Sequence, residues 1–145
     1  MKKLTLLLAV ALPLLFQFTE LNAQAAKNTI YTVQTQYIKG MMDSTERAAL
    51  ASMLQEYHQK VTMKNELILS EKTMWHFWTD DSRELVTITE YADWSSIEKA
   101  GDRGGELEKQ AWPDAKQRAD FMKKMSGHFS HHKDAIYNGL PKLTK

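Results

Sequence analysis

Histidine is concentrated near the C-terminus of the chain. Three of its five histidines, His128, His131 and His132, fall within a short segment. Imidazoles three or four residues apart share a helix face and suit zinc, copper or nickel, so one hypothesis is a metal site that Asp134 or a glutamate would complete. Gly127 favours the alternative, in which a helix ends there and the histidines are solvated or cap its last carbonyl groups.

Another histidine lies in an aromatic segment, residues 74–78. Alternate side chains of a strand share a face, so His76 would face the same side as Met74 and Trp78. That face would form an aromatic pocket for a flat apolar ligand, or for haem with His76 as an axial ligand. In the alternative interpretation these side chains fill the core or a dimer interface, and His76 bonds to a polar neighbour.

Polar side chains on the central strands could orient a small ligand. They could equally form a satisfied hydrogen-bond network or face solvent, because sequence alone does not set the register of the strands. The residues are Tyr31, Thr35, Tyr37, Thr87, Thr89 and Glu90. Tyr31 and Tyr37 are the candidates for contact with a ligand.

Common catalytic motifs are absent from the sequence. It has no phosphate-binding glycine loop, dinucleotide fingerprint, Gly-x-Ser-x-Gly or His-Glu-x-x-His. The absence of cysteine excludes disulfides, thiolate metal sites, a cysteine nucleophile and a cysteine-linked lipid anchor. No cofactor is required by these patterns, and whether the protein is an enzyme stays open.

Alternating and helical patterns predict the first half of the fold. Thr29 to Ile38 alternates and is rich in β-branched and aromatic residues, which indicates a strand. Asp43 and Glu46 form a capping box for a helix from about Ser44 to Met63. Leu67 to Thr79 and Glu84 to Tyr91 then predict an antiparallel hairpin with a loop of about four residues.

The second half of the chain predicts two helices and a strand. Asp93 or Ser95 would cap a short helix through Ala100, which the glycines of residues 101–105 would break. Another helix would begin before Trp112 or restart at Pro113, and would end at Gly127. A last strand is predicted from Asp134 to Leu140.

This order predicts a ferredoxin-like βαββαβ fold of the α+β class. Two helices would cover one face of a four-stranded antiparallel sheet. The first two strands carry large apolar groups on both faces, so the other face also needs a cover. Two copies packed sheet to sheet would supply it, which predicts a homodimer.

The chain resembles the dimeric α+β barrel superfamily over roughly residues 30–143. The resemblance rests on the element order, on the segment Glu90-Tyr91-Ala92-Asp93-Trp94 and on the aromatic strand Trp75-His76-Phe77-Trp78. The superfamily includes antibiotic-biosynthesis-monooxygenase-like, stress-responsive-barrel and NIPSNAP-like domains. It implies a fold and a dimer more than a reaction, since its members include cofactor-free monooxygenases and haem-degrading enzymes.

Residues 1–25 have the pattern of a secretory signal peptide. Lys2 and Lys3 precede an apolar run too short to span a bilayer, and small residues follow at Ala23 and Ala25. This pattern predicts a periplasmic or secreted protein, with no membrane insertion after cleavage. Residues 26–145 would form one α+β domain, in which equal numbers of acidic and basic residues argue against nucleic-acid binding.

Three functions are compatible with these features. The first is an exported, dimeric module that binds a small apolar or aromatic molecule between helices and sheet. The second is a monooxygenase-like or haem-handling enzyme, with His76 or the His128 to His132 group as base or ligand, and with haem or a divalent metal as the possible cofactor. The third is a structural or assembly subunit.

Overall fold

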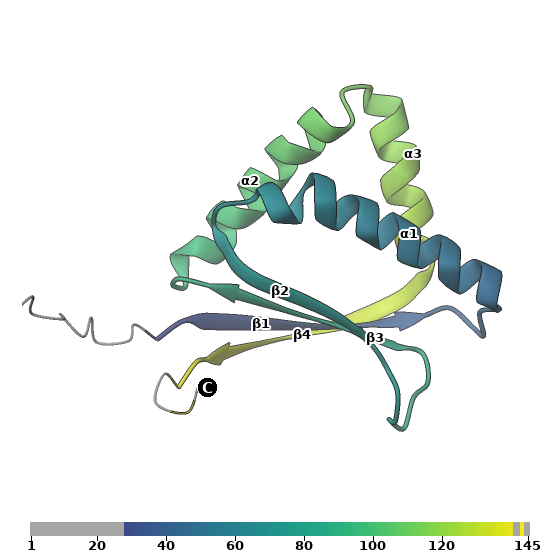
Figure 1. The fold of residues 1–145 in the computed structure, drawn as a ribbon, viewed down its shortest axis with the longest axis horizontal. Helices are drawn as coiled ribbons and strands as arrows, with labels where there is room; N and C mark the ends of the chain where they lie inside the picture. Colours follow the sequence, from purple (N-terminus) through teal and green to yellow (C-terminus); the bar gives the residue numbers. More distant parts are fainter. Residues whose placement is uncertain (1–27, 141–142, 144–145) are drawn as a thin grey trace, which may run out of the picture.

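The computed structural model describes residues 28–140 and Leu143. The predicted signal peptide, residues 1–25, lies outside these residues. Four strands and three α-helices follow one another, with a short 3-10 helix after the first helix (Figure 1). The elements are β1 (Ile30–Ile38), α1 (Ser44–Lys60), η1 (Thr62–Lys64), β2 (Ile68–Trp75), β3 (Glu84–Tyr91), α2 (Ser95–Ala111), α3 (Ala115–Ser126) and β4 (Phe129–Asn138).

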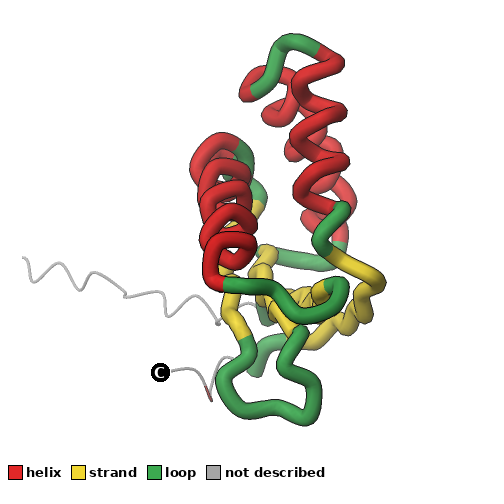
Figure 2. The backbone as a smooth tube through the Cα atoms, turned by 90° about the vertical axis from the view of Figure 1, so that its right-hand side faces the viewer, coloured by secondary structure: helices red, strands yellow, loops and turns green. Residues whose placement is uncertain are grey.

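The strands form one antiparallel sheet in the order β2-β3-β1-β4. The helices lie together on one side of it (Figures 1 and 2). This confirms the predicted ferredoxin-like α+β fold. No helix in the described part of the chain covers the opposite side of the sheet, so the molecule has two layers and one open sheet face.

The start of α1 confirms the predicted capping box. The Asp43 carboxylate accepts hydrogen bonds from the backbone amides of Thr45 and Glu46, both at 2.8 Å. The Glu46 carboxylate in turn accepts from the Asp43 amide at 3.0 Å. These bonds satisfy amides that have no partner inside the helix, and α1 then buries Leu50 and Met53. The helix ends at Lys60, before the predicted end at Met63.

The predicted break at residues 101–105 is wrong, because α2 runs through these glycines to Ala111. Glycine costs a helix interior about 1 kcal/mol relative to alanine, which tertiary packing can offset. Ala100 and Leu107 are buried on either side of the glycines. The Asn65 side chain also donates to the Ala100 carbonyl oxygen at 2.8 Å, which holds α2 against the segment after η1.

The strand ends also differ from the prediction. β2 stops at Trp75 instead of Thr79, and residues 76–83 form a longer loop than predicted. In that loop Asp81 accepts three hydrogen bonds from Arg83, which lower the pKa of the Asp81 carboxyl to about 2. β4 begins at Phe129 instead of Asp134, because its first residues pair with the end of β1.

A helix-layer cluster joins the three helices. Trp112 is 3 % exposed and stacks on Phe121 with ring centroids 4.4 Å apart. The other members come from the helices and the segment after α1: Tyr57, Val61, Leu107, Ala111 and Met122. None of the helices within residues 28–140 is long and apolar enough to span a membrane.

Two glycine substitutions test this description of the backbone. Gly101→Ala should raise the free energy of unfolding by about 0.5–1 kcal/mol, because a Cβ there meets no atom within 4 Å and alanine favours the helix. Gly40→Ala should lower it by about 1 kcal/mol, because the φ angle of Gly40 is 66°. Urea denaturation measures both. A destabilised Gly101→Ala variant would contradict a continuous α2.

Candidate functional site

A cavity of about 640 Å³ lies between the helices and the sheet. Its floor is made by side chains of β1, β2 and β3, and its walls come from α1, the end of α3 and the start of β4. The wall is mainly apolar, through Leu54, Met125, Phe129 and the ring of Tyr57. Polar groups of the helix layer, His58 and the Tyr57 hydroxyl among them, interrupt this apolar surface.

The floor of the cavity is polar because of the strand register. Gln34 pairs with Thr87, and Thr87 pairs with Thr73, so these side chains form a row on the helix side of the sheet. The Thr73 and Thr87 hydroxyls are 3.0 Å apart, and the Gln34 amide donates to Asp134 at 3.1 Å. Together with Gln36 they offer amide and hydroxyl groups to a ligand.

An acid–base pair joins the wall to the floor. His58, in the last turn of α1, places its Nδ1 3.2 Å from the Glu71 Oε1 of β2. The Thr89 hydroxyl donates to the other Glu71 oxygen at 3.4 Å. The Glu71 side chain is 17 % exposed and that of His58 is 44 % exposed. A sheltered carboxylate and an accessible imidazole therefore meet at the cavity.

Tyr57 is the second polar group of the wall. Burial raises the pKa of its hydroxyl well above the ordinary value, and the hydrogen bond to Glu108, at 2.8 Å, raises it further. The phenol therefore stays protonated and acts as a donor. Tyr57, Thr62 and Glu71 also line a smaller cavity of about 200 Å³ beneath α2, so the two spaces share a boundary.

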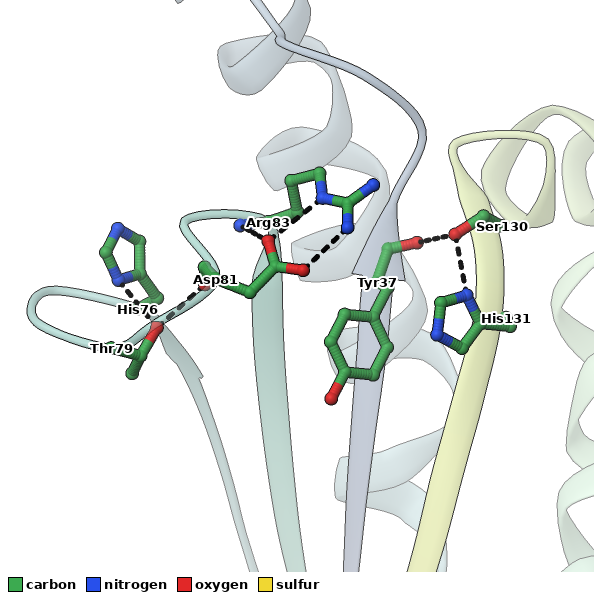
Figure 3. A network of polar contacts seen from close by, with 7 residues as sticks. All are labelled: Tyr37, His76, Thr79, Asp81, Arg83, Ser130 and His131. Carbon is green, nitrogen blue, oxygen red and sulfur yellow. Dashed lines mark hydrogen bonds and ion pairs between the residues drawn. The ribbon is translucent and has the colours of Figure 1, made fainter.

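The predicted aromatic pocket is not formed by its proposed residues within this chain. His76 lies beyond the end of β2, where its Nδ1 is 3.1 Å from the Thr79 hydroxyl (Figure 3). Trp78 is 92 % exposed in the loop, and Met74 is 36 % exposed near the end of β2. None of these three residues lines the 640 Å³ cavity. The strand alternation on which the prediction depended ends before His76.

Tyr31 and Tyr37 lie on the open face of the sheet, away from the cavity. The Tyr31 hydroxyl donates to Glu90 at 2.7 Å, and this bond, with one from Ser70, lowers the pKa of the Glu90 carboxyl. The Tyr37 ring stacks on His131 with centroids 4.3 Å apart. These contacts match the hydrogen-bonded alternative for the polar strand residues.

The three C-terminal histidines do not converge on a site. His131 pairs with Tyr37 on the open face, whereas His132 pairs with Gln36 on the opposite one. The His132 Nε2 lies 3.1 Å from an Asp134 carboxylate oxygen, and His128 precedes the strand. No group of three or more histidine, cysteine or carboxylate side chains within residues 28–140 could hold a metal ion.

Sequence reasoning missed His58 and Glu71. The available signal was a carboxylate in a predicted strand, which alternation places on the same face as Leu69 and Thr73. His58 belongs to a helix whose sequence pattern predicts a solvated face beside an apolar stripe, so nothing in that pattern singles out the histidine. Only the packing of α1 over β2 brings the two side chains together, and no sequence spacing encodes that contact.

Comparison with known proteins adds information on the fold. No protein-family model matches the sequence, and no curated protein sequence matches it significantly. Solved structures do match. The fold is that of antibiotic-biosynthesis-monooxygenase-like proteins.

Three matched structures illustrate this fold. SnoaB, a cofactor-independent oxygenase from Streptomyces nogalater, matches in a variant form with a TM-score of 0.51, 10 % identity and coverage of 81 % of this chain and 98 % of that one. A protein from Caulobacter crescentus CB15 assigned as an antibiotic biosynthesis monooxygenase matches with a TM-score of 0.52 and 11 % identity, and the match covers 79 % of this chain and 92 % of that one. A conserved protein from Methanosarcina mazei Go1 matches with a TM-score of 0.51 and 12 % identity, and the match covers 79 % of this chain and 95 % of that one. At these identities the likeness concerns the fold alone.

The Tyr57–Glu108 contact predicts how stability depends on alkaline pH. Because the Tyr57 pKa is raised in the folded state, its contribution is complete below the unfolded value of about 10 and is lost as pH rises through the folded value. Tyr57→Phe should lower the free energy of unfolding by about 1 kcal/mol at neutral pH and reduce its decline above about pH 10. Urea denaturation at several pH values measures this.

A second tyrosine provides the control for this change. Tyr137→Phe makes the same substitution at a side chain that is 57 % exposed, and it should leave the neutral stability nearly unchanged. Equal alkaline slopes for the wild type and Tyr57→Phe would show that the Tyr57 hydroxyl is not protected in the fold.

Proposed function

We propose that the protein binds a small, partly apolar molecule in the cavity between the helices and the sheet. The observation that carries this proposal is the combination of size and lining: about 640 Å³, with a mainly apolar wall and a polar floor. Binding sites for small molecules combine an apolar lining with a few polar groups that orient the ligand. The proposed position matches the expected one, between helices and sheet, but its residues differ from the aromatic segment.

A variant that narrows the cavity tests the binding proposal. Ser126 is an exposed α3 residue at the cavity, and its hydroxyl bonds to the Lys123 carbonyl oxygen at 3.3 Å. Ser126→Trp should weaken the binding of the fluorescent probe anilinonaphthalene sulfonate at least about tenfold, because the indole would occupy space that the probe needs. Fluorescence titration gives the dissociation constant.

The matched control is a serine on another helix. Ser52 is also exposed and also bonds to a backbone carbonyl oxygen, that of Ala48 at 2.9 Å, but it does not line the cavity. Ser52→Trp should bind the probe as the wild type does. Equal affinities of all three proteins would place the probe elsewhere and count against the proposed site.

A second candidate function is that of an enzyme of the monooxygenase type. Two observations favour it: the fold is shared with a cofactor-independent oxygenase, and the cavity contains the His58–Glu71 pair. A histidine oriented by a carboxylate is a common base in enzymes. The molecule bound in the cavity would then be a substrate that the protein converts, and not a ligand that it releases chemically unchanged.

We also propose that the open sheet face packs against a second copy of the chain. Half-buried apolar side chains run across the centre of this face: Val33, Val86, Ile88 and Ala135. Burying such a face removes apolar surface from water, which is the main force in stable association.

Residues 1–25 are proposed to direct export and to be removed.

Native mass spectrometry of the protein from its own host's envelope tests export and dimerisation together. We expect a dimer of chains that begin near residue 26, since the signal peptide would be cleaved. Ile88→Lys should give a monomer, because it places a charge at the centre of the open face. Ile136→Lys makes the same change on the other side of the sheet, where Ile136 pairs with Thr32 and is 45 % exposed, and should stay dimeric. A full-length monomer would contradict both proposals.

A further inference from the structure

We propose that His58 accepts a proton from the molecule in the cavity, with Glu71 as the positioning residue. The substrate class is a carbon acid, a small molecule with a C–H bond next to a carbonyl or similar electron-withdrawing group. This inference rests on the proposed binding function and adds a chemical step to it. It replaces His76 and the C-terminal histidines as the candidate base.

The contact with Glu71 determines which nitrogen of His58 can act as a base. An ionised carboxylate only accepts hydrogen bonds, so the 3.2 Å contact requires a proton on the His58 Nδ1. In the neutral ring the lone pair is then on Nε2. This is the arrangement in which a base is held in one tautomer and one orientation by a third group.

The different exposures of Glu71 and His58 fit different roles, with Glu71 as the positioning residue and His58 as the base. Glu71, at 17 % exposed, is also held by Thr89, whereas the His58 ring is 44 % exposed and lines the cavity. The chain contains a second pair of the same chemistry, His132 and Asp134 at 3.1 Å, in which both side chains are 56 % exposed and neither lines the cavity. Of these two pairs in the described part of the chain, only the His58–Glu71 pair is placed to meet a molecule in the cavity.

The floor of the cavity can stabilise the negative charge that proton transfer creates. When Nε2 of His58 takes the proton, the C–H bond breaks, an N–H bond forms, and the electron pair moves through carbon onto the adjacent oxygen as an enolate. The side-chain amides of Gln34 and Gln36 and the hydrogen-bonded Thr73–Thr87 hydroxyl pair line that side of the cavity and carry N–H and O–H donors. Donors that are already in place at the site of developing charge lower the barrier.

A nitrobenzisoxazole is a suitable probe because its ring opening needs only a base. The base removes the ring C–H proton, the electron pair forms the nitrile, and the N–O bond breaks to give a coloured nitrophenolate. The wild type should open the probe faster than free imidazole at equal concentration, and His58→Gln should reduce the rate at least about tenfold, since a positioned base contributes roughly 100-fold or more. His132→Gln should keep the wild-type rate.

The rate comparison has clear contradictory outcomes. A wild-type rate no greater than that of imidazole, or a rate that His58→Gln leaves unchanged, would overturn the assignment of His58. Equal losses in His58→Gln and His132→Gln would overturn it too, because they would show that no specific histidine is responsible.

The positioning role of Glu71 is tested by the tautomer of His58. Long-range proton–nitrogen NMR at a pH where the ring is neutral should show the proton on Nδ1 in the wild type and a mixture of both tautomers in Glu71→Gln. The same tautomer ratio in both proteins would overturn the role of Glu71. If the wild type binds anilinonaphthalene sulfonate, Ser126→Trp weakens that binding, and the rate test nevertheless fails, only the assignment of His58 as a base is overturned. Failure of binding itself would remove the proposed function.

Discussion

The register of β1 against β3 and β4 sets which side chains face the helices and which face the open side of the sheet. β1 and β3 are the two central strands, and β1 joins β3 on one edge to β4 on the other, so its register determines which side chains share a face. Gln34 and Gln36 point to the helices, whereas Val33 and Thr35 point to the open side. A shift of one residue would exchange these sets and place the apolar row beneath α1. The polar cavity floor and the apolar open face are therefore two results of one register.

The helix layer is held over this sheet by contacts that also shape the cavity. Leu50 and Met53 bury one side of α1, and the Asp43 cap sets where the helix begins. The last turn of α1 then lies over β2, which brings His58 to Glu71. A half-buried carboxylate needs hydrogen-bond partners, and His58 and Thr89 supply them. The same contacts that satisfy Glu71 in the fold orient a potential base at the cavity.

The fold and the site carry different information about function. The fold is shared with a cofactor-independent oxygenase and with a conserved protein from Methanosarcina mazei Go1, both at 12 % identity or less. A fold of this kind can hold unrelated sites, so the similarity does not set the chemistry. The chemistry has to come from the residues that face the cavity. Here these are an imidazole, a carboxylate, amides and hydroxyls beside apolar side chains, which is why the binding proposal and the His58 proposal concern this space.

Short-range patterns were enough to predict the order of the elements, the α+β class, the start of α1 at Asp43 and the end of α3 before Gly127, because caps and alternation act over a few residues. Tertiary structure decided the continuity of α2, the end of β2 and the start of β4. The continuity of α2 and the start of β4 depend on distant segments, through the burial of Leu107 in the helix layer and the pairing of β4 with β1. The loop after β2 is held by the contact of Asp81 with its near neighbour Arg83. Tertiary structure also decided the site, since thirteen positions of chain separate His58 from Glu71 and only the packing of a helix on a strand turns that separation into a 3.2 Å contact.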